Sequence, residues 1–149
     1  MKRSKHMSGW SRATWRWMVA TMLGMWGSGM VLLVWPADVL MTLGEWPQVI
    51  RHGAVVLHGV VTWLLCVLCG RGLWPHLRVI WPRREALAHW AWGWVSLVAL
   101  CCVAAAGLLL LYGPAGLHDR ASELHGWLGL VLPALVLAHV WWRSLPSRA

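Results

Sequence analysis

Four long apolar stretches without Asp, Glu, Lys or Arg constrain this chain more than any other feature. Each is close to the ~20 residues that a helix needs to cross a bilayer core. Only helices or closed barrels satisfy the backbone in lipid, and barrel strands are about half this length. We therefore expect an all-α protein, a four-transmembrane-helix bundle that forms one membrane domain over residues 1–149. The predicted helices cover about residues 17–35, 53–74, 86–112 and 124–142, the second being free of charge as far as residue 70.

The basic residues lie almost entirely on one side of the predicted membrane. Of 13 Lys and Arg residues, five lie in the N-terminal arm, four between the second and third stretches and two in the C-terminal tail. The positive-inside rule assigns these three segments, and so both termini, to the cytoplasm. Topology and membrane lipid account for the net charge of +8, so we expect no nucleic-acid partner.

A short repeat divides the chain into two similar halves. The segment GMVLLVWPA at 29–37 resembles GLLLLYGPA at 107–115. Each precedes a predicted outer loop and then the tripeptide Leu-His-Gly, at 57–59 and 124–126. This pattern predicts two pseudo-repeated helical hairpins, in which the second and fourth helices are parallel and equivalent.

Histidines at matching depths are the main candidates for a functional site. His125 and His139 are 14 residues apart, which places them roughly 40° apart around one helix and about 21 Å apart along it. They therefore share a face, one near each membrane surface. His58 lies at the same outer level as His125, because the helices predicted at 53–74 and 124–142 both enter the membrane from outside. At the inner level, the partner of His139 is either His76 or His89.

Two imidazoles that face each other from neighbouring helices are what axial ligation of a haem iron requires. Polar side chains at this depth are costly and usually face a partner inside a bundle. We predict that His58 and His125 bind an outer haem b, and that His139 binds an inner one with His76 or His89. The haem is non-covalent, because the chain has no C-x-x-C-H motif. The small residues Gly59, Gly126 and Gly129 suit a planar group pressed against the backbone.

With these residues, the chain resembles the small bacterial membrane di-haem b cytochromes. That group includes the gamma subunits of formate dehydrogenases and the b subunits of membrane-bound hydrogenases. The resemblance covers the four predicted spans, and its strongest elements are His125-x13-His139 and the Leu-His-Gly at 57–59. It implies a bacterial inner-membrane cytochrome, or a subunit of a quinone-linked oxidoreductase, that passes electrons between a larger redox complex or other redox partner and the quinone pool.

The chain departs from this family at its first helix. The family usually takes a fourth haem ligand from the cytoplasmic start of that helix, often as His-Trp. Here the stretch reads TWRWMV, with Arg16 and Trp17 and no histidine. The inner haem is therefore either absent or completed by His76 or His89, so one haem or two are expected.

The four cysteines suggest a different function. Cys66 and Cys69 form a C-x-x-C in the second predicted helix, and Cys101 and Cys102 lie in the third. This arrangement also fits a membrane thiol–quinone oxidoreductase, although such enzymes need accessible thiols of lowered pKa. We favour a packing role for these residues. A third interpretation, a haem-free membrane-anchor subunit, does not explain histidines at matched depth.

Overall fold

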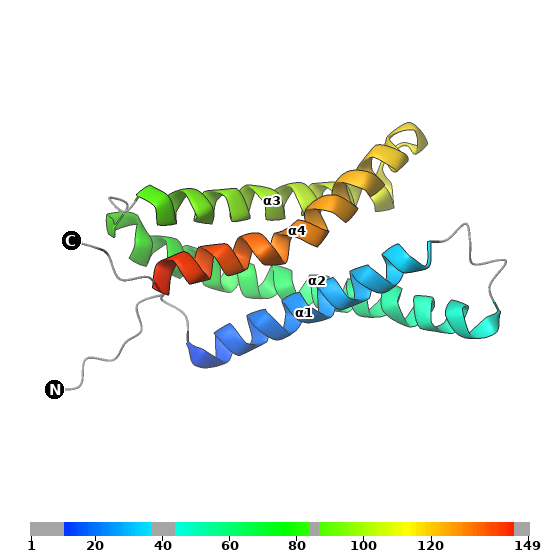
Figure 1. Cartoon of the computed structure of the whole chain (residues 1–149), viewed down its shortest axis with the longest axis horizontal. Coiled ribbons are helices and arrows are strands. Elements are labelled where there is room, and N and C mark those ends of the chain that lie inside the picture. The colour runs from blue at the N-terminus through cyan, green and yellow to red at the C-terminus, as the bar shows by residue number, and fades with distance from the viewer. Residues whose placement is uncertain (1–10, 37–43, 84–86, 145–149) are drawn as a thin grey trace. The chain divides into compact units, whose positions relative to one another are not determined.

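The computed structural model describes residues 11–36, 44–83 and 87–144. Within these ranges the regular structure is entirely helical, and its four long helices are all long and apolar enough to cross a membrane. The predicted all-α, four-span fold is therefore confirmed. The long helices, labelled in Figure 1, are α1 (Arg12–Val34), α2 (Glu45–Ile80), α3 (Leu87–Tyr112) and α4 (His118–Ser144). Two short 3-10 helices, η2 (Trp81–Arg83) and η3 (Ala115–Leu117), follow α2 and α3.

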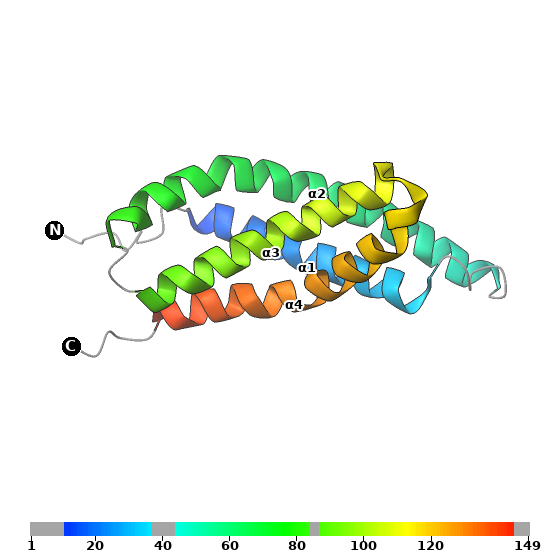
Figure 2. The ribbon, with the colours of Figure 1, turned by 90° about the horizontal axis from the view of Figure 1, so that it is seen from above.

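The helices pair as two consecutive hairpins. Helices α1 and α2 pack against each other in one compact unit, hereafter hairpin 1, and α3 and α4 pack in a second, hairpin 2. Figure 2 shows α3 and α4 running side by side in opposite directions. The connections after α1 and after α3 are short enough for each of these helices to pack antiparallel against the next one.

The helices extend beyond the stretches that lack charge. Helix α2 begins at Glu45 rather than at residue 53 and ends at Ile80 rather than at residue 74. Its 36 residues span about 54 Å, well beyond the ~30 Å of a bilayer core. Helix α1 likewise starts early, after Ser11, whose hydroxyl accepts a hydrogen bond from the backbone N–H of Thr14 at 3.1 Å. The charged residues therefore limit the length of chain that can lie in lipid, but they do not limit the length of the helix.

A proline at position 75 predicts an interruption of the second helix just before His76, and the structure contradicts this prediction. Helix α2 contains Pro75 and continues to Ile80. Proline removes one hydrogen-bond donor, but membrane helices tolerate this loss where neighbouring groups satisfy the freed carbonyl. Helix α4 also contains a proline, Pro133, and it bends along its length (Figure 1). His76 therefore lies on the same continuous helix as His58.

Small side chains form most of the contact surface inside the hairpins. Ala106 on α3 is only 1% exposed, and Thr21 and Ser28 on α1 are buried as well. Large apolar side chains such as Trp63 and Tyr112 are instead mostly exposed. This distribution is typical of membrane helices, because lipid already solvates large apolar groups and close backbone approach provides the packing energy.

The two hairpins bury equivalent positions. Each buried residue described in α1 has a buried counterpart in α3 that lies 78 residues later, which is also the separation of Gly29 from Gly107. Both buried residues described in α4 have buried counterparts in α2 that lie 67 residues earlier, which is the separation of His58 from His125. The predicted repeat is therefore present in the structure. The pairs are Met18 and Ser96, Thr21 and Ala99, Ser28 and Ala106, Ala54 and Ala121, and Leu65 and Leu132.

Candidate functional site

The two predicted outer ligands, His58 and His125, occupy equivalent places in their hairpins. The imidazole of His58 on α2 lies against Gly29 of α1, where an added Cβ would be 3.6 Å from Cε1 of the ring. The imidazole of His125 on α4 lies against Gly107 of α3, where the same distance would be 3.1 Å. Each glycine opens one of the repeated nine-residue segments, and each histidine is the centre of a Leu-His-Gly. The repeat thus brings its two motifs into contact within each hairpin.

The predicted inner ligand His139 makes a third contact of this kind. Its ring lies against Gly93 of α3, where an added Cβ would be 3.1 Å from Cε1, and its Nδ1 is buried. Gly93 and Gly107 are 14 residues apart on α3, as His125 and His139 are on α4. The antiparallel helices α3 and α4 therefore pair in the same register at the His125–Gly107 contact and at the His139–Gly93 contact. Both imidazoles share the face of α4 that packs on α3, as their spacing predicts.

Hydrogen bonds determine the tautomer of His58. Its Nδ1 lies 2.9 Å from the hydroxyl oxygen of Ser28, and this hydroxyl donates to the backbone carbonyl of Met25 at 3.0 Å. A hydroxyl has one proton, and a carbonyl can only accept. The proton of Ser28 is thus directed to Met25, and Nδ1 of His58 must be the donor in the other bond. A neutral imidazole held in this way has its lone pair on Nε2.

The half-buried ring of His125 has the same tautomer for a simpler reason. Its Nδ1 lies 3.0 Å from the backbone carbonyl oxygen of Val103, so Nδ1 donates and the lone pair is on Nε2. Helical side chains lean toward the N-terminus and cover the preceding turn. The absence of a side chain at Gly107 therefore exposes the carbonyl of Val103, whose second lone pair accepts the imidazole proton.

The two alternative inner ligands are placed differently. His76 is half-buried on α2, five helical turns from His58, and so belongs to the other hairpin from His139. His89 lies in the first turn of α3, four residues before Gly93. The side chain of His89 is outside the described residues. The choice between the two as the partner of His139 stays a prediction.

The four cysteines are divided between the hairpins, with Cys66 and Cys69 on α2 and Cys101 and Cys102 on α3. All four lie in described helices, and none forms a disulfide. Cys101 and Cys102 are consecutive helical residues, so their side chains point about 100° apart. The thiol–quinone function stays an untested alternative.

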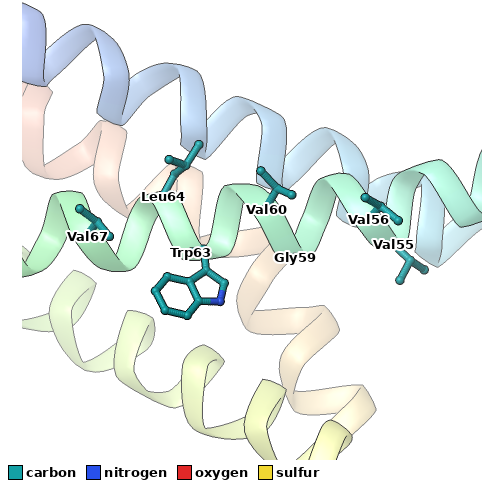
Figure 3. A pocket seen from close by; sticks show the side chains of 7 residues that line it. All are labelled: Val55, Val56, Gly59, Val60, Trp63, Leu64 and Val67. Carbon is teal, nitrogen blue, oxygen red and sulfur yellow. The ribbon is translucent and has the colours of Figure 1, made fainter.

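A shallow apolar groove runs along α2 over residues 55–67. It contains no titratable side chain, and Trp63 points away from α1 in Figure 3 and is 75% exposed. The groove therefore offers contact area to an apolar group but no ligand for a metal. It is lined by Val55, Val56, Gly59, Val60, Trp63, Leu64 and Val67.

Sequence reasoning identified the histidines but missed the residues that hold them. The glycine contacts of Gly29, Gly93 and Gly107 and the hydroxyl of Ser28 were not predicted. Two signals were available: Gly29 and Gly107 open the repeated segments, and Gly93 precedes Gly107 by the spacing of the two histidines on α4. Comparison of the chain with protein-family models, curated proteins and solved structures found no match, so the imidazoles, their hydrogen bonds and their glycine contacts are what supports a function.

Proposed function

We propose that this protein is an integral-membrane b-type cytochrome that carries electrons across a bacterial inner membrane between a redox partner and the quinone pool. In this proposal His58 and His125 hold an outer haem b. His139 holds an inner one with His76 or His89. Haem, when bound, supplies the one-electron chemistry, while the protein supplies ligation, orientation and a low dielectric. The positive-inside rule places both termini in the cytoplasm.

The observation that carries the proposal is that Nδ1 of both His58 and His125 is hydrogen-bonded to the partner helix, which leaves Nε2 as the nitrogen that could bind iron. Iron ligation by a neutral imidazole requires one unprotonated nitrogen, and in metal sites a hydrogen bond at the other nitrogen usually holds the ring. Both histidines donate from Nδ1 to a group on the partner helix, Ser28 in one hairpin and Val103 in the other.

The glycines support the same function. Gly29 and Gly107 let each ring approach the partner helix closely, and this contact together with the Nδ1 hydrogen bond restricts the ring to one orientation. Gly59 and Gly126 directly follow the two histidines, and an added Cβ at either would meet no atom within 4 Å. Packing inside the hairpins therefore does not require glycine at these two positions. Room for a planar macrocycle against the backbone is a reason for it.

The proposal is tested by the absorption spectrum of detergent-purified protein. We expect b-type Soret and alpha bands in the reduced-minus-oxidised spectrum, and haem content per chain distinguishes one haem from two. His125→Ala and His58→Ala should each remove the outer haem. The matched control is His118→Ala, because His118 is an exposed histidine at the start of the same helix as His125. A protein that binds no haem when expressed with a full haem supply would end the proposal.

A second experiment tests ligation rather than overall folding. His125→Gly leaves a space that free imidazole can enter, so adding imidazole to this variant should restore the low-spin spectrum of the outer haem. The same addition to His118→Gly should change nothing. If imidazole has no effect on His125→Gly although the variant is folded, His125 is not a ligand. If haem is absent and Cys66→Ala abolishes a disulfide-forming activity, the thiol–quinone function replaces the cytochrome.

A further inference from the structure

The Nδ1 hydrogen bonds of His58 and His125 end at equivalent backbone carbonyls. Met25 and Val103 are 78 residues apart, the separation that relates α1 to α3. Each precedes the contacting glycine, Gly29 or Gly107, by four residues, so each carbonyl is exposed by the missing side chain of that glycine. In hairpin 2 the imidazole reaches this carbonyl directly. In hairpin 1 the hydroxyl of Ser28 lies between the ring and the carbonyl.

The difference has a cause in the sequence. The counterpart of Ser28 in α3 is Ala106, which has no hydroxyl, and both positions are buried. The ring of His58 also stands farther from its glycine than the ring of His125 does, at 3.6 Å against 3.1 Å from the added Cβ to Cε1. An inserted hydroxyl requires this extra distance. The hydrogen bonds and the ring positions thus agree: a hydroxyl bridges in hairpin 1, and the bond is direct in hairpin 2.

We propose that Ser28 is a positioning residue for the outer site, where its hydroxyl passes the hydrogen bond of His58 to the Met25 carbonyl. It sets the tautomer and the place of the His58 ring, and it makes His58 and His125 chemically different ligands. A hydroxyl that donates to one partner is a better acceptor for another, so the two bonds strengthen each other. Hydrogen bonds at the non-ligating nitrogen tune the basicity of a metal-bound imidazole, and here only one of the two imidazoles has a bridging hydroxyl.

The direct test observes the ring nitrogens of His58. Protein labelled with nitrogen-15 histidine is measured by NMR, and the His58 signals are assigned by their loss in His58→Ala. Ser28→Ala should move the Nδ1 signal of His58 and leave that of His125 in place. Ser28→Thr, which keeps the hydroxyl, should retain the native signal. Ala106→Ser supplies the missing hydroxyl to hairpin 2 and should move the signal of His125 instead. An unchanged His58 signal in Ser28→Ala would overturn the role of Ser28.

A second measurement rests on the proposed cytochrome function. Loss of a hydrogen bond behind a metal ligand typically weakens metal binding by about 10- to 100-fold, so haem should dissociate from Ser28→Ala faster by roughly this factor. Ser28→Thr should restore the native rate. Equal dissociation rates for all three proteins would overturn the positioning role at the haem. The two proposals can fail separately. If the protein binds no haem but the His58 signal moves in Ser28→Ala, the positioning role of Ser28 is upheld and the cytochrome function is rejected.

Discussion

Replacing Gly107 by Ala should destabilise the protein, whereas the same change at Gly29 should not. An added Cβ at Gly107 would lie 3.1 Å from Cε1 and 3.3 Å from Nδ1 of His125. The corresponding distances from Gly29 to the ring of His58 are 3.6 and 3.9 Å, which are ordinary contacts. The ring of His125 must therefore retreat by about 0.4 Å to reach the roughly 3.5 Å at which carbon atoms attract. This movement draws Nδ1 away from the carbonyl of Val103, now 3.0 Å distant.

The comparison of the two variants isolates the imidazole contact. Both replace a mid-helix glycine by alanine, which favours the helix by about 1 kcal/mol, and this gain cancels in the difference. The lengthened hydrogen bond contributes up to about 1 kcal/mol, and a small overpacking contributes about 1 kcal/mol more. Gly107→Ala should therefore be less stable than Gly29→Ala by up to about 2 kcal/mol, or roughly thirtyfold in the unfolding equilibrium.

The assay is reversible unfolding in lipid bicelles, followed by a probe that reports loss of helix packing. Gly93→Ala serves as a second positive case, because an added Cβ there also lies 3.1 Å from a ring carbon, that of His139. Gly27→Ala serves as a neutral control, since its Cβ would meet no atom within 4 Å. If Gly107→Ala proves as stable as Gly29→Ala, the ring of His125 is not held against Gly107 and the prediction is wrong.

Three further predictions concern packing, the outer end of hairpin 1 and topology. Gly24→Ala places a Cβ 3.2 Å from Cγ1 of Val61 and should be less stable than Gly27→Ala by about 1 kcal/mol. Val61→Ala should remove most of this difference in a double-mutant cycle, and strict additivity would contradict the contact. Arg51 donates from Nε to the backbone carbonyl of Trp35 at 3.0 Å. Arg51→Ala should therefore speed amide hydrogen exchange in the last turn of α1, and Arg51→Lys should not restore protection because lysine lacks the planar guanidinium. Reporter fusions at both termini should be active in the cytoplasm, and an active periplasmic reporter at either end would reject the topology.

The sequence alone determined the fold class, the number of spans and the division into two similar hairpins. These follow from the absence of charge in stretches of membrane-spanning length, since lipid accepts only a backbone that satisfies its own hydrogen bonds. The repeat was also visible, because the separations of 78 and 67 residues between its motifs recur between buried positions. Helix ends were less predictable. Helix α2 runs from Glu45 to Ile80 and contains Pro75, so neither the charged residues nor the proline marked where it begins or ends.

Only the tertiary structure decided what the histidines contact. The 14-residue spacing of His125 and His139 predicts a shared face, but it does not say which residues of α3 that face meets. The answer depends on the register between two antiparallel helices, and small residues on both sides decide it through close approach. Ser28 illustrates the same point. From sequence it is an ordinary helical serine bonded to its own backbone, and it becomes the partner of His58 because α2 places that ring within 2.9 Å of its hydroxyl.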